Sequence, residues 1–172
     1  MKVISDTPPE NPGYLKVHKL QLQGKKGPVS REYLNSKDAV AAVVFDSVKN
    51  KYIFAKQFRP GPQLHIIELC AGMIDHVGEA EIETMKREIE EELGYATDTI
   101  NQIMKPYYSS PGKTNERMSL YFATVSKKIS QGGGLESENE EIEIVELTKD
   151  EIRKTDFVDG KTLLALMILK LK

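Results

Sequence analysis

The sequence contains a single cysteine, Cys70, and no tryptophan among its 172 residues. One cysteine excludes an internal disulfide and favours a reducing compartment, so we expect a cytoplasmic protein. The longest apolar runs, such as Leu163–Leu169, are far too short to cross a bilayer, and the N-terminus lacks the basic-then-apolar form of a signal peptide. No membrane partner is therefore expected.

The sequence also lacks any large excess of charge of one sign, since its formal net charge is −2 at pH 7. Proteins that bind nucleic acids usually carry a basic surface, so no nucleic-acid partner is expected. The hydrophobic share of 40% and the charged share of 29% are ordinary for a globular domain. A chain of this length is able to bury a full hydrophobic core.

Apolar runs rich in β-forming residues predict more strands than helices, an α+β pattern. Strands are expected over 40–45, 52–58, 64–70, 118–125 and 142–147, and helices over 80–93, from Thr148 onward and over 163–171. Residues 14–22 change hydrophobic phase midway, which predicts a bulged strand before a turn at Gly24–Gly27. The chain therefore divides into an N-terminal β extension, 1–35, and a main domain, 36–172.

The segment 80–93 has the apolar spacing of an amphipathic helix, and Gly94 is placed to end it. Its last turn carries Glu88, Glu91 and Glu92, which share one face. They repel one another by ~0.2–0.5 kcal/mol per pair, and the helix dipole disfavours anions at this end. A divalent cation such as Mg²⁺, which prefers carboxylate oxygens, resolves the conflict. A solvated acidic face is the alternative that the run alone leaves open.

The residues around this run resemble the Nudix box, G-x5-E-x7-R-E-U-x-E-E-x-G-U, in which U is a bulky apolar residue. The second half matches at every position from Arg87 to Tyr95. In the first half, six residues rather than five separate Gly72 from Glu79, which we interpret as a one-residue insertion in the loop before the helix. A match at this many fixed positions favours a metal site over a plain acidic face.

Other segments resemble the branch of this family that acts on nucleoside diphosphate sugars, including the ADP-ribose pyrophosphatases and the GDP-mannose hydrolases. These segments are Lys56–Arg59, Glu68–Gly72, Ser110–Gly112 with Glu116, and Gly133–Leu135. The loop at Glu138–Glu140 is nearer to the ADP-ribose enzymes, and Asp159–Thr162 is nearer to the GDP-mannose enzymes. The resemblance implies a Nudix α/β/α sandwich with a mixed β-sheet. It also implies a homodimer in which the N-terminal strands contact the other subunit and help to shape the pocket.

The resemblance implies a divalent metal ion, Mg²⁺ with Mn²⁺ as the alternative, held by oxygen ligands. Glu88 and Glu92 are expected to be direct ligands, with Glu91 beside them. The carbonyl of Ala71 is expected to complete the set from the preceding loop, and Glu140 to add a further ligand.

The same resemblance assigns the remaining catalytic roles. Arg87 is expected to orient a glutamate of the box, such as Glu79, rather than to touch the substrate. Glu138 is expected to be the general base, on a glycine-rich loop that also carries Glu136 and Glu141. An exposed acidic loop without a catalytic role is the alternative.

Five residues are candidates for binding the substrate. Arg59 has a planar guanidinium suited to bidentate phosphate contact. Arg31 is expected to reach a phosphate of the substrate, either in its own subunit or in the partner subunit. Ser110 and Gly112 are expected in the loop that lines the sugar or nucleotide pocket, and Glu116 matches a family contact residue. A surface glutamate at a strand edge is the alternative for Glu116.

The resemblance thus implies a Mg²⁺-dependent hydrolase of nucleoside diphosphate sugars. Its reaction would convert ADP-ribose into AMP and ribose 5-phosphate, or GDP-mannose into GMP and mannose 1-phosphate. The alternatives are a housecleaning nucleotide pyrophosphatase and a non-catalytic sensor of nucleotide sugars. The Ser110–Gly112 loop and the N-terminal extension disfavour the first alternative, and the retained glutamates of the box disfavour the second.

Overall fold

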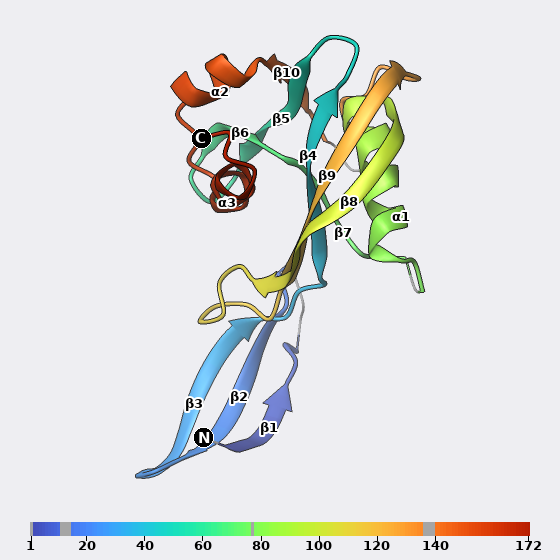
Figure 1. Cartoon of the computed structure of the whole chain (residues 1–172). Coiled ribbons are helices and arrows are strands. Elements are labelled where there is room, and N and C mark those ends of the chain that lie inside the picture. The colour runs from blue at the N-terminus through green and yellow to red at the C-terminus, as the bar shows by residue number, and fades with distance from the viewer. Residues whose placement is uncertain (1, 11–14, 77, 136–139) are drawn as a thin grey trace.

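The computed structural model describes residues 2–10, 15–76, 78–135 and 140–172, and its N-terminal strands form a sheet of their own. This antiparallel sheet contains β1 (Lys2–Thr7), β2 (Val17–Gly24) and β3 (Gly27–Leu34), and it projects from the rest of the molecule (Figure 1). Gly24 pairs with Gly27, so Lys25 and Lys26 form a two-residue turn between β2 and β3.

The second sheet has seven strands and forms the centre of the main domain. Its path is β10 (Glu143–Leu147), β5 (Lys51–Arg59), β4 (Ala39–Asp46), β9 (Arg117–Lys128) and β8 (Tyr95–Tyr108). Two short strands extend it, because β6 (Leu64–Glu68) pairs with β5 and β7 (Cys70–Met73) pairs with β4. β4 and β9 are parallel and the other pairs are antiparallel, so the sheet is mixed, as the resemblance implied.

Helices cover both faces of this sheet (Figure 1). On one side, α1 (Glu81–Glu88) continues into the π-helical turn η1 (Ile89–Leu93). On the other side lie α2 (Lys149–Lys154) and α3 (Gly160–Ile168). Thr148 and Glu151 form the predicted capping box at the start of α2. In the part of the chain that the structure describes, no helix is both long and apolar enough to span a membrane.

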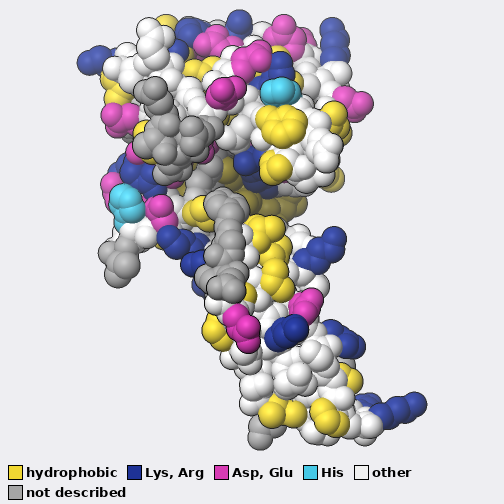
Figure 2. All heavy atoms as spheres, turned by 180° about the vertical axis from the view of Figure 1, so that it is seen from behind, with side chains coloured by type: hydrophobic (Ala, Val, Ile, Leu, Met, Phe, Trp, Pro, Cys, Tyr) yellow, Lys and Arg dark blue, Asp and Glu magenta, His cyan; other side chains and the backbone are white. Residues whose placement is uncertain are grey.

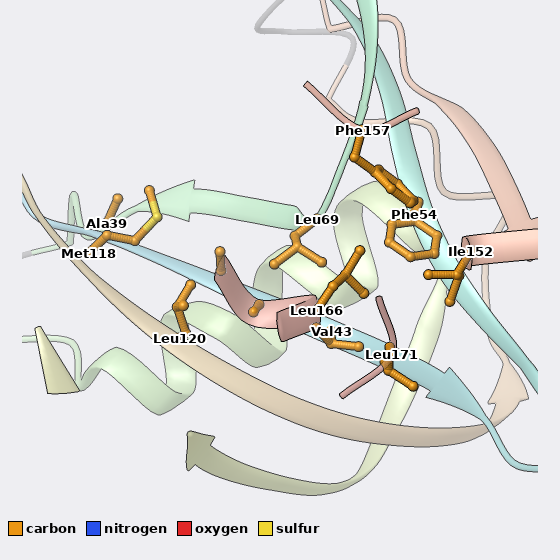
Figure 3. Close-up of a cluster of buried hydrophobic side chains, with 12 residues drawn as sticks. Ala39, Val43, Phe54, Leu69, Met118, Leu120, Ile152, Phe157, Leu166 and Leu171 are labelled. Atoms are coloured by element: carbon orange, nitrogen blue, oxygen red, sulfur yellow. The ribbon is translucent and has the colours of Figure 1, made fainter. Parts of the chain in front are cut away.

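The central strand β4 packs against helices on both of its faces, which divides the core into two clusters. Val40, Ala42 and Val44 belong to the cluster that includes three α1 and η1 side chains, Met85, Ile89 and Leu93. The alternate residues, Ala39, Ala41 and Val43, belong to the cluster with Ile152, Phe157 and Leu166 (Figure 3). Successive strand residues point to opposite faces, so burial at every position requires a layer on each side. The predicted α/β/α sandwich is confirmed.

Several details differ from the sequence predictions, which also named no separate strand at β1 or β3 and placed the last helix over 163–171 instead of Gly160–Ile168. The bulge expected over 14–22 is absent from Val17–Leu22, which pair regularly with β3; the irregularity lies in β1, between Val3 and Ser5. The strand expected over 64–70 is interrupted at Leu69, so β6 and β7 pair with different neighbours. β8 was not predicted at all: its residues are mostly exposed or half-buried, so they lack a clear hydrophobic alternation.

Candidate active site

The π-helical turn η1 places the glutamate run at the inner end of α1. Gly94 ends this turn with φ of 79°, a left-handed conformation that glycine adopts without strain. A π-helical turn is rare and is often found at functional sites, where the wider turn re-aims side chains. The turn therefore determines where the Glu91 and Glu92 side chains point. These directions differ from those expected for a regular α-helix.

A glycine-rich loop packs directly on the end of η1. The backbone N–H of Gly133 donates to the carbonyl of Glu92 at 2.8 Å, and that of Gly134 donates to the carbonyl of Glu91 at 3.2 Å. A Cβ on Gly132 would lie 2.6 Å from the carbonyl carbon of Leu93, so only glycine permits this approach. The loop thus satisfies the free carbonyls of the helix end and joins it to the segment that continues to Glu140.

Glu92 is almost fully enclosed, with 5% of its surface exposed. Its Oε2 accepts a hydrogen bond of 3.2 Å from the backbone N–H of Ala71. Burial, reinforced by the charge of the neighbouring Glu88, raises the pKa of Glu92 to about 8. A buried carboxylate with a raised pKa has too few positive partners, so an added cation would lower its free energy.

Glu88 lies against the backbone of β7. A Cβ on Gly72 would lie 2.0 Å from the Glu88 carboxyl carbon, so the glycine of the box provides the space that this carboxylate fills. Burial raises the pKa of Glu88 to about 7, with the charge of Arg87 acting in the opposite direction. Two neighbouring carboxylates therefore share the same shortage of positive charge.

Arg87 contacts several glutamates of the box at once. Its Nη1 donates to Oε2 of Glu91 at 2.8 Å and lies 2.9 Å from Oε1 of Glu88. Its Nε lies 3.5 Å from Oε1 of Glu79, an ionic contact that is too long for a strong hydrogen bond. An orienting role for Arg87 stays a prediction; the contacts add Glu88 and Glu91 to Glu79 as glutamates that Arg87 touches.

The oxygen atoms around η1 are of the kind that binds a hard divalent cation, but they do not point toward one common position. Within the described ranges, no three Asp, Glu, His or Cys side chains are close enough together to hold an ion. Glu91 turns to Arg87, and Glu92 turns to the Ala71 N–H. The N–H and C=O of one strand residue point to the same side, so the Ala71 carbonyl also faces η1. Carboxylate and carbonyl oxygens are the ligands that Mg²⁺ and Mn²⁺ prefer, so the residues fit such an ion in kind.

A cavity of about 660 Å³ opens beside these carboxylates. Its lining includes Ala71 and Gly72, the β7 residues that contact Glu92 and Glu88, and also Glu140, whose Oε2 accepts from the Leu135 N–H at 3.3 Å. Arg59 and Lys161 contribute positive charge to the lining, and apolar side chains such as Met118 complete it. The cavity therefore lies between a wall that carries the cations Arg59 and Lys161 and the β7 backbone at Ala71 and Gly72, which contacts Glu92 and Glu88; these two glutamates do not line the cavity themselves.

The cationic wall is organised by one buried carboxylate. Glu68, whose side chain is 3% exposed, accepts a hydrogen bond of 2.6 Å from Arg59 Nε through Oε1. Its Oε2 accepts a hydrogen bond from Lys161 Nζ, which also lies 3.1 Å from Asp159 Oδ2. Asp159 caps the N-terminus of α3 by accepting from the Thr162 N–H at 3.0 Å. In the sequence, Asp159–Thr162 and Glu68 stood out only as parts of segments that resemble the family. That Lys161 lines the cavity and that Glu68 holds both cations was not predicted.

The far side of the cavity receives some of the substrate-binding candidates. Glu116 lines it together with Ser109, whose hydroxyl donates to Glu116 Oε1 at 2.8 Å. Ser110 and Gly112 belong to the adjoining turn, closed by a 2.8 Å bond from the Lys113 N–H to the Ser110 carbonyl, but they do not line the cavity. Direct contact of these two residues with substrate stays a prediction.

Two candidates lie away from the cavity or cannot be placed. Arg31 lies on β3 of the projecting sheet and donates to the Ser30 carbonyl at 2.8 Å. It is not among the residues that line the cavity, so contact with a phosphate would require a second subunit. Glu138, the expected general base, lies outside the described residues.

Comparisons with known proteins place this geometry in a family context. The sequence model described as "NUDIX domain" matches residues 35–166. The chain is 32% identical over 146 residues to a methanol dehydrogenase activator of Bacillus methanolicus, covering 83% of this chain and 77% of the relative. It is 30% identical over 154 residues to a GDP-mannose pyrophosphatase of Cronobacter sakazakii, covering 83% and 78%. It is 29% identical over 150 residues to an ADP-ribose pyrophosphatase of Bacillus subtilis, covering 85% and 80%.

A solved structure supports the fold independently of sequence. The crystal structure of an ADP compounds hydrolase superposes with a TM-score of 0.78 at 18% sequence identity, covering 99% of this chain and 93% of that one. The similarity extends over both the projecting sheet and the main domain.

Proposed function

The chain belongs to the NUDIX domain family, and from this premise we propose that it hydrolyses the pyrophosphate bond of a nucleoside diphosphate sugar. The observation that carries the proposal is the cavity lined by Arg59 and Lys161 on one side and, on the other, by Ala71 and Gly72, whose backbone contacts Glu92 and Glu88. The relatives named GDP-mannose pyrophosphatase and ADP-ribose pyrophosphatase support the same class of substrate.

The cationic wall binds the diphosphate. Arg59 and Lys161 each give one bond to Glu68, so the buried carboxylate holds both cations at the cavity surface. The terminal guanidinium nitrogens of Arg59 have no hydrogen-bond partner among the described residues, and they are suited to two parallel bonds to a phosphate. Lys161 adds a point charge beside them.

The carboxylates behind Ala71 and Gly72 would hold a divalent ion, Mg²⁺ first and Mn²⁺ as the alternative. Glu88, Glu92 and the Ala71 carbonyl would be its ligands, with Glu91 and Glu140 completing the set. Such an ion neutralises charge on the phosphate oxygens and lowers the pKa of a bound water. To serve as a ligand, Glu91 would have to release the hydrogen bond that it accepts from Arg87, because that bond occupies one of its carboxylate oxygens.

The reaction adds water to one phosphorus and breaks its bond to the bridging oxygen. The products are a nucleoside monophosphate and a sugar phosphate, so atoms balance without any further reactant. A carboxylate must accept the proton of the attacking water. We assign this role to Glu138. It lies two positions before Glu140 in the sequence, and Glu140 lines the cavity.

GDP-mannose is the first substrate to test and ADP-ribose is the second. Asp159, Gly160 and Lys161, the segment that resembles the GDP-mannose enzymes, all line the cavity. The segment that resembles the ADP-ribose enzymes includes Glu138, outside the described residues. A non-catalytic sensor is disfavoured because such a protein has no need to keep three mutually repelling glutamates.

We also propose a homodimer that forms through the projecting sheet. Val3, Ile4 and Val17 expose 56%, 57% and 40% of their surfaces on this small sheet. Figure 2 shows hydrophobic side chains along this narrow part of the molecule. An apolar surface on a thin, three-stranded sheet is unfavourable in water, and burial against a second copy removes it.

The experiment that tests the function compares GDP-mannose, ADP-ribose and UDP-glucose at equal concentration, with EDTA, Mg²⁺ or Mn²⁺. We expect release of a nucleoside monophosphate from GDP-mannose or ADP-ribose only when metal is present. When glutamates of the box such as Glu92 are replaced by Gln in the same assay, Glu83→Gln is the matched control, because Glu83 is an exposed glutamate near the start of α1. Tight binding of a nucleotide sugar without hydrolysis under any metal condition would favour the sensor instead.

A further inference from the structure

A line of side-chain hydrogen bonds connects the projecting sheet to the loop that carries Glu116. Asp6 Oδ1 lies 2.9 Å from His18 Nδ1, and Asn35 Nδ2 lies 3.2 Å from the other ring nitrogen, Nε2. Asn115 Nδ2 donates to Asn35 Oδ1 at 2.9 Å, and Asn115 Oδ1 accepts from the Ser36 N–H at 2.8 Å. We name the four side chains from Asp6 to Asn115 the relay.

The direction of every bond in the relay is fixed from one end. A backbone N–H only donates, so Asn115 presents its oxygen to Ser36 and its NH₂ group to Asn35. Asn35 must then accept with its oxygen and donate with its NH₂ group. His18 Nε2 therefore accepts, and its proton resides on Nδ1, where it donates to Asp6. No amide in this line is free to flip without breaking a bond.

The relay ends at the substrate cavity. Asn115 directly precedes Glu116, whose carboxylate lines the cavity and accepts from Ser109. The backbone contacts between sheet and loop are one bond of 2.8 Å, from the Leu34 N–H to the Lys113 carbonyl, and a longer one of 3.4 Å, from the Asn115 N–H to the Leu34 carbonyl. The relay therefore adds side-chain bonds to the connection between the projecting sheet and this loop, beside the bond of Ser109 to Glu116 and the bonds of the next residue, Arg117, to Asp38.

We propose that His18 and Asn35 are positioning residues that fix Asn115, and through it Glu116, in the wall of the cavity. The projecting sheet then influences the affinity of the cavity in its own subunit for the nucleotide sugar without touching the ligand bound there. The consequence for affinity rests on the proposed function, whereas the mechanical connection does not.

The test replaces His18 by Phe, which keeps an aromatic ring beside Tyr33 but removes both ring nitrogens. Tyr33→Phe is the matched control, because it removes the other bond to Asp6, of 2.8 Å, and leaves the relay complete. With its partner gone, Asn35 turns to water and releases Asn115. We expect faster amide hydrogen exchange at Ser36 in His18→Phe and parent-like exchange in Tyr33→Phe.

Steady-state kinetics measure the consequence for the substrate. His18→Phe should raise KM about two- to tenfold, the effect of losing one net hydrogen bond, and leave kcat within about twofold. In a Glu116→Ala background the same change should leave KM unaltered, because the side chain that the relay positions is already absent. A KM increase of equal size in both backgrounds would contradict the positioning role.

Two further measurements keep the outcome decisive. Asn35→Leu keeps a side chain of similar size but removes its bonds to both His18 and Asn115, so it should reproduce the KM increase. At pH 8, NMR of the parent imidazole should show the His18 proton on Nδ1; a proton on Nε2 would overturn the relay. Unchanged Ser36 exchange in His18→Phe would also overturn it, and this readout needs no turnover, so it stays decisive even if nucleotide sugars are not hydrolysed.

Discussion

Replacement of Glu92 by Gln separates the two effects of a buried carboxylate at a metal site. The pKa of Glu92 is about 8 in the folded protein, against an ordinary value of 4.5. A carboxyl group with a raised pKa contributes to the free energy of unfolding fully below about pH 4.5, and this contribution is lost as the pH rises through about 8. The replacing amide carries no charge, so the metal-free variant should keep this stability. Each pH unit in that interval is worth ~1.4 kcal/mol, so the gain at pH 9 is roughly 3–5 kcal/mol.

The assay is urea denaturation in EDTA at pH 5 and pH 9, combined with turnover in saturating Mg²⁺. The variant should equal the parent in stability at pH 5 to within about 1 kcal/mol and exceed it at pH 9. Its turnover should fall at least about 100-fold, because a ligand charge is absent. Glu83→Gln, on the exposed side of α1, is the control and should change neither quantity. Parent-like turnover in Glu92→Gln, or equal stability of the two proteins at pH 9, would refute the reasoning.

The remaining predictions concern the metal ion, a glycine of the box, the phosphate contact and the dimer. Mg²⁺ competes with protons for Glu88, whose pKa is about 7; the Mg²⁺-induced rise in Tm should therefore be larger at pH 8.5 than at pH 6, and an equal rise at both would place the ion elsewhere. Gly72→Ala puts a Cβ 2.0 Å from the Glu88 carboxyl carbon, so activity should fall at least tenfold, whereas Gly61→Ala, with no atom within 4 Å, should be neutral in an activity assay. Lys161→Met should raise KM for nucleotide sugars about tenfold or more through loss of a phosphate contact, and initial rates showing an unchanged KM would remove Lys161 from the binding wall. Light scattering should give twice the chain mass, and Val17→Glu should shift it toward the monomer if the projecting sheet forms the interface.

Features set by neighbouring residues were predicted well from the sequence. The apolar spacing of α1 indicated the face that buries Met85, Ile89 and Leu93, and Gly94 ends the helix with the expected left-handed conformation. The Thr148 capping box was equally local. These signals act within one or two helical turns, so they do not depend on the rest of the fold.

Features set by distant residues were not predictable in the same way. Glu68 meets Lys161 across 93 positions, and the charge pattern of neither segment indicates that contact. The π-helical turn is invisible to a 3.6-residue pattern, because its apolar residues stay buried in either geometry. Ser109 rather than Ser110 lines the cavity, since the turn after β8 decides which of two adjacent serines faces inward. Each of these depends on how the sheet brings separate segments together.

The central claim is that the carboxylates at the end of α1 hold the metal ion needed for pyrophosphate cleavage. The most direct measurement is anomalous scattering from crystals grown with Mn²⁺ and a non-hydrolysable GDP-mannose analogue. We expect a Mn²⁺ peak within ligand distance of the Glu88 and Glu92 carboxylates, with the diphosphate between that peak and Arg59. A bound analogue with no anomalous peak beside these two glutamates would contradict it.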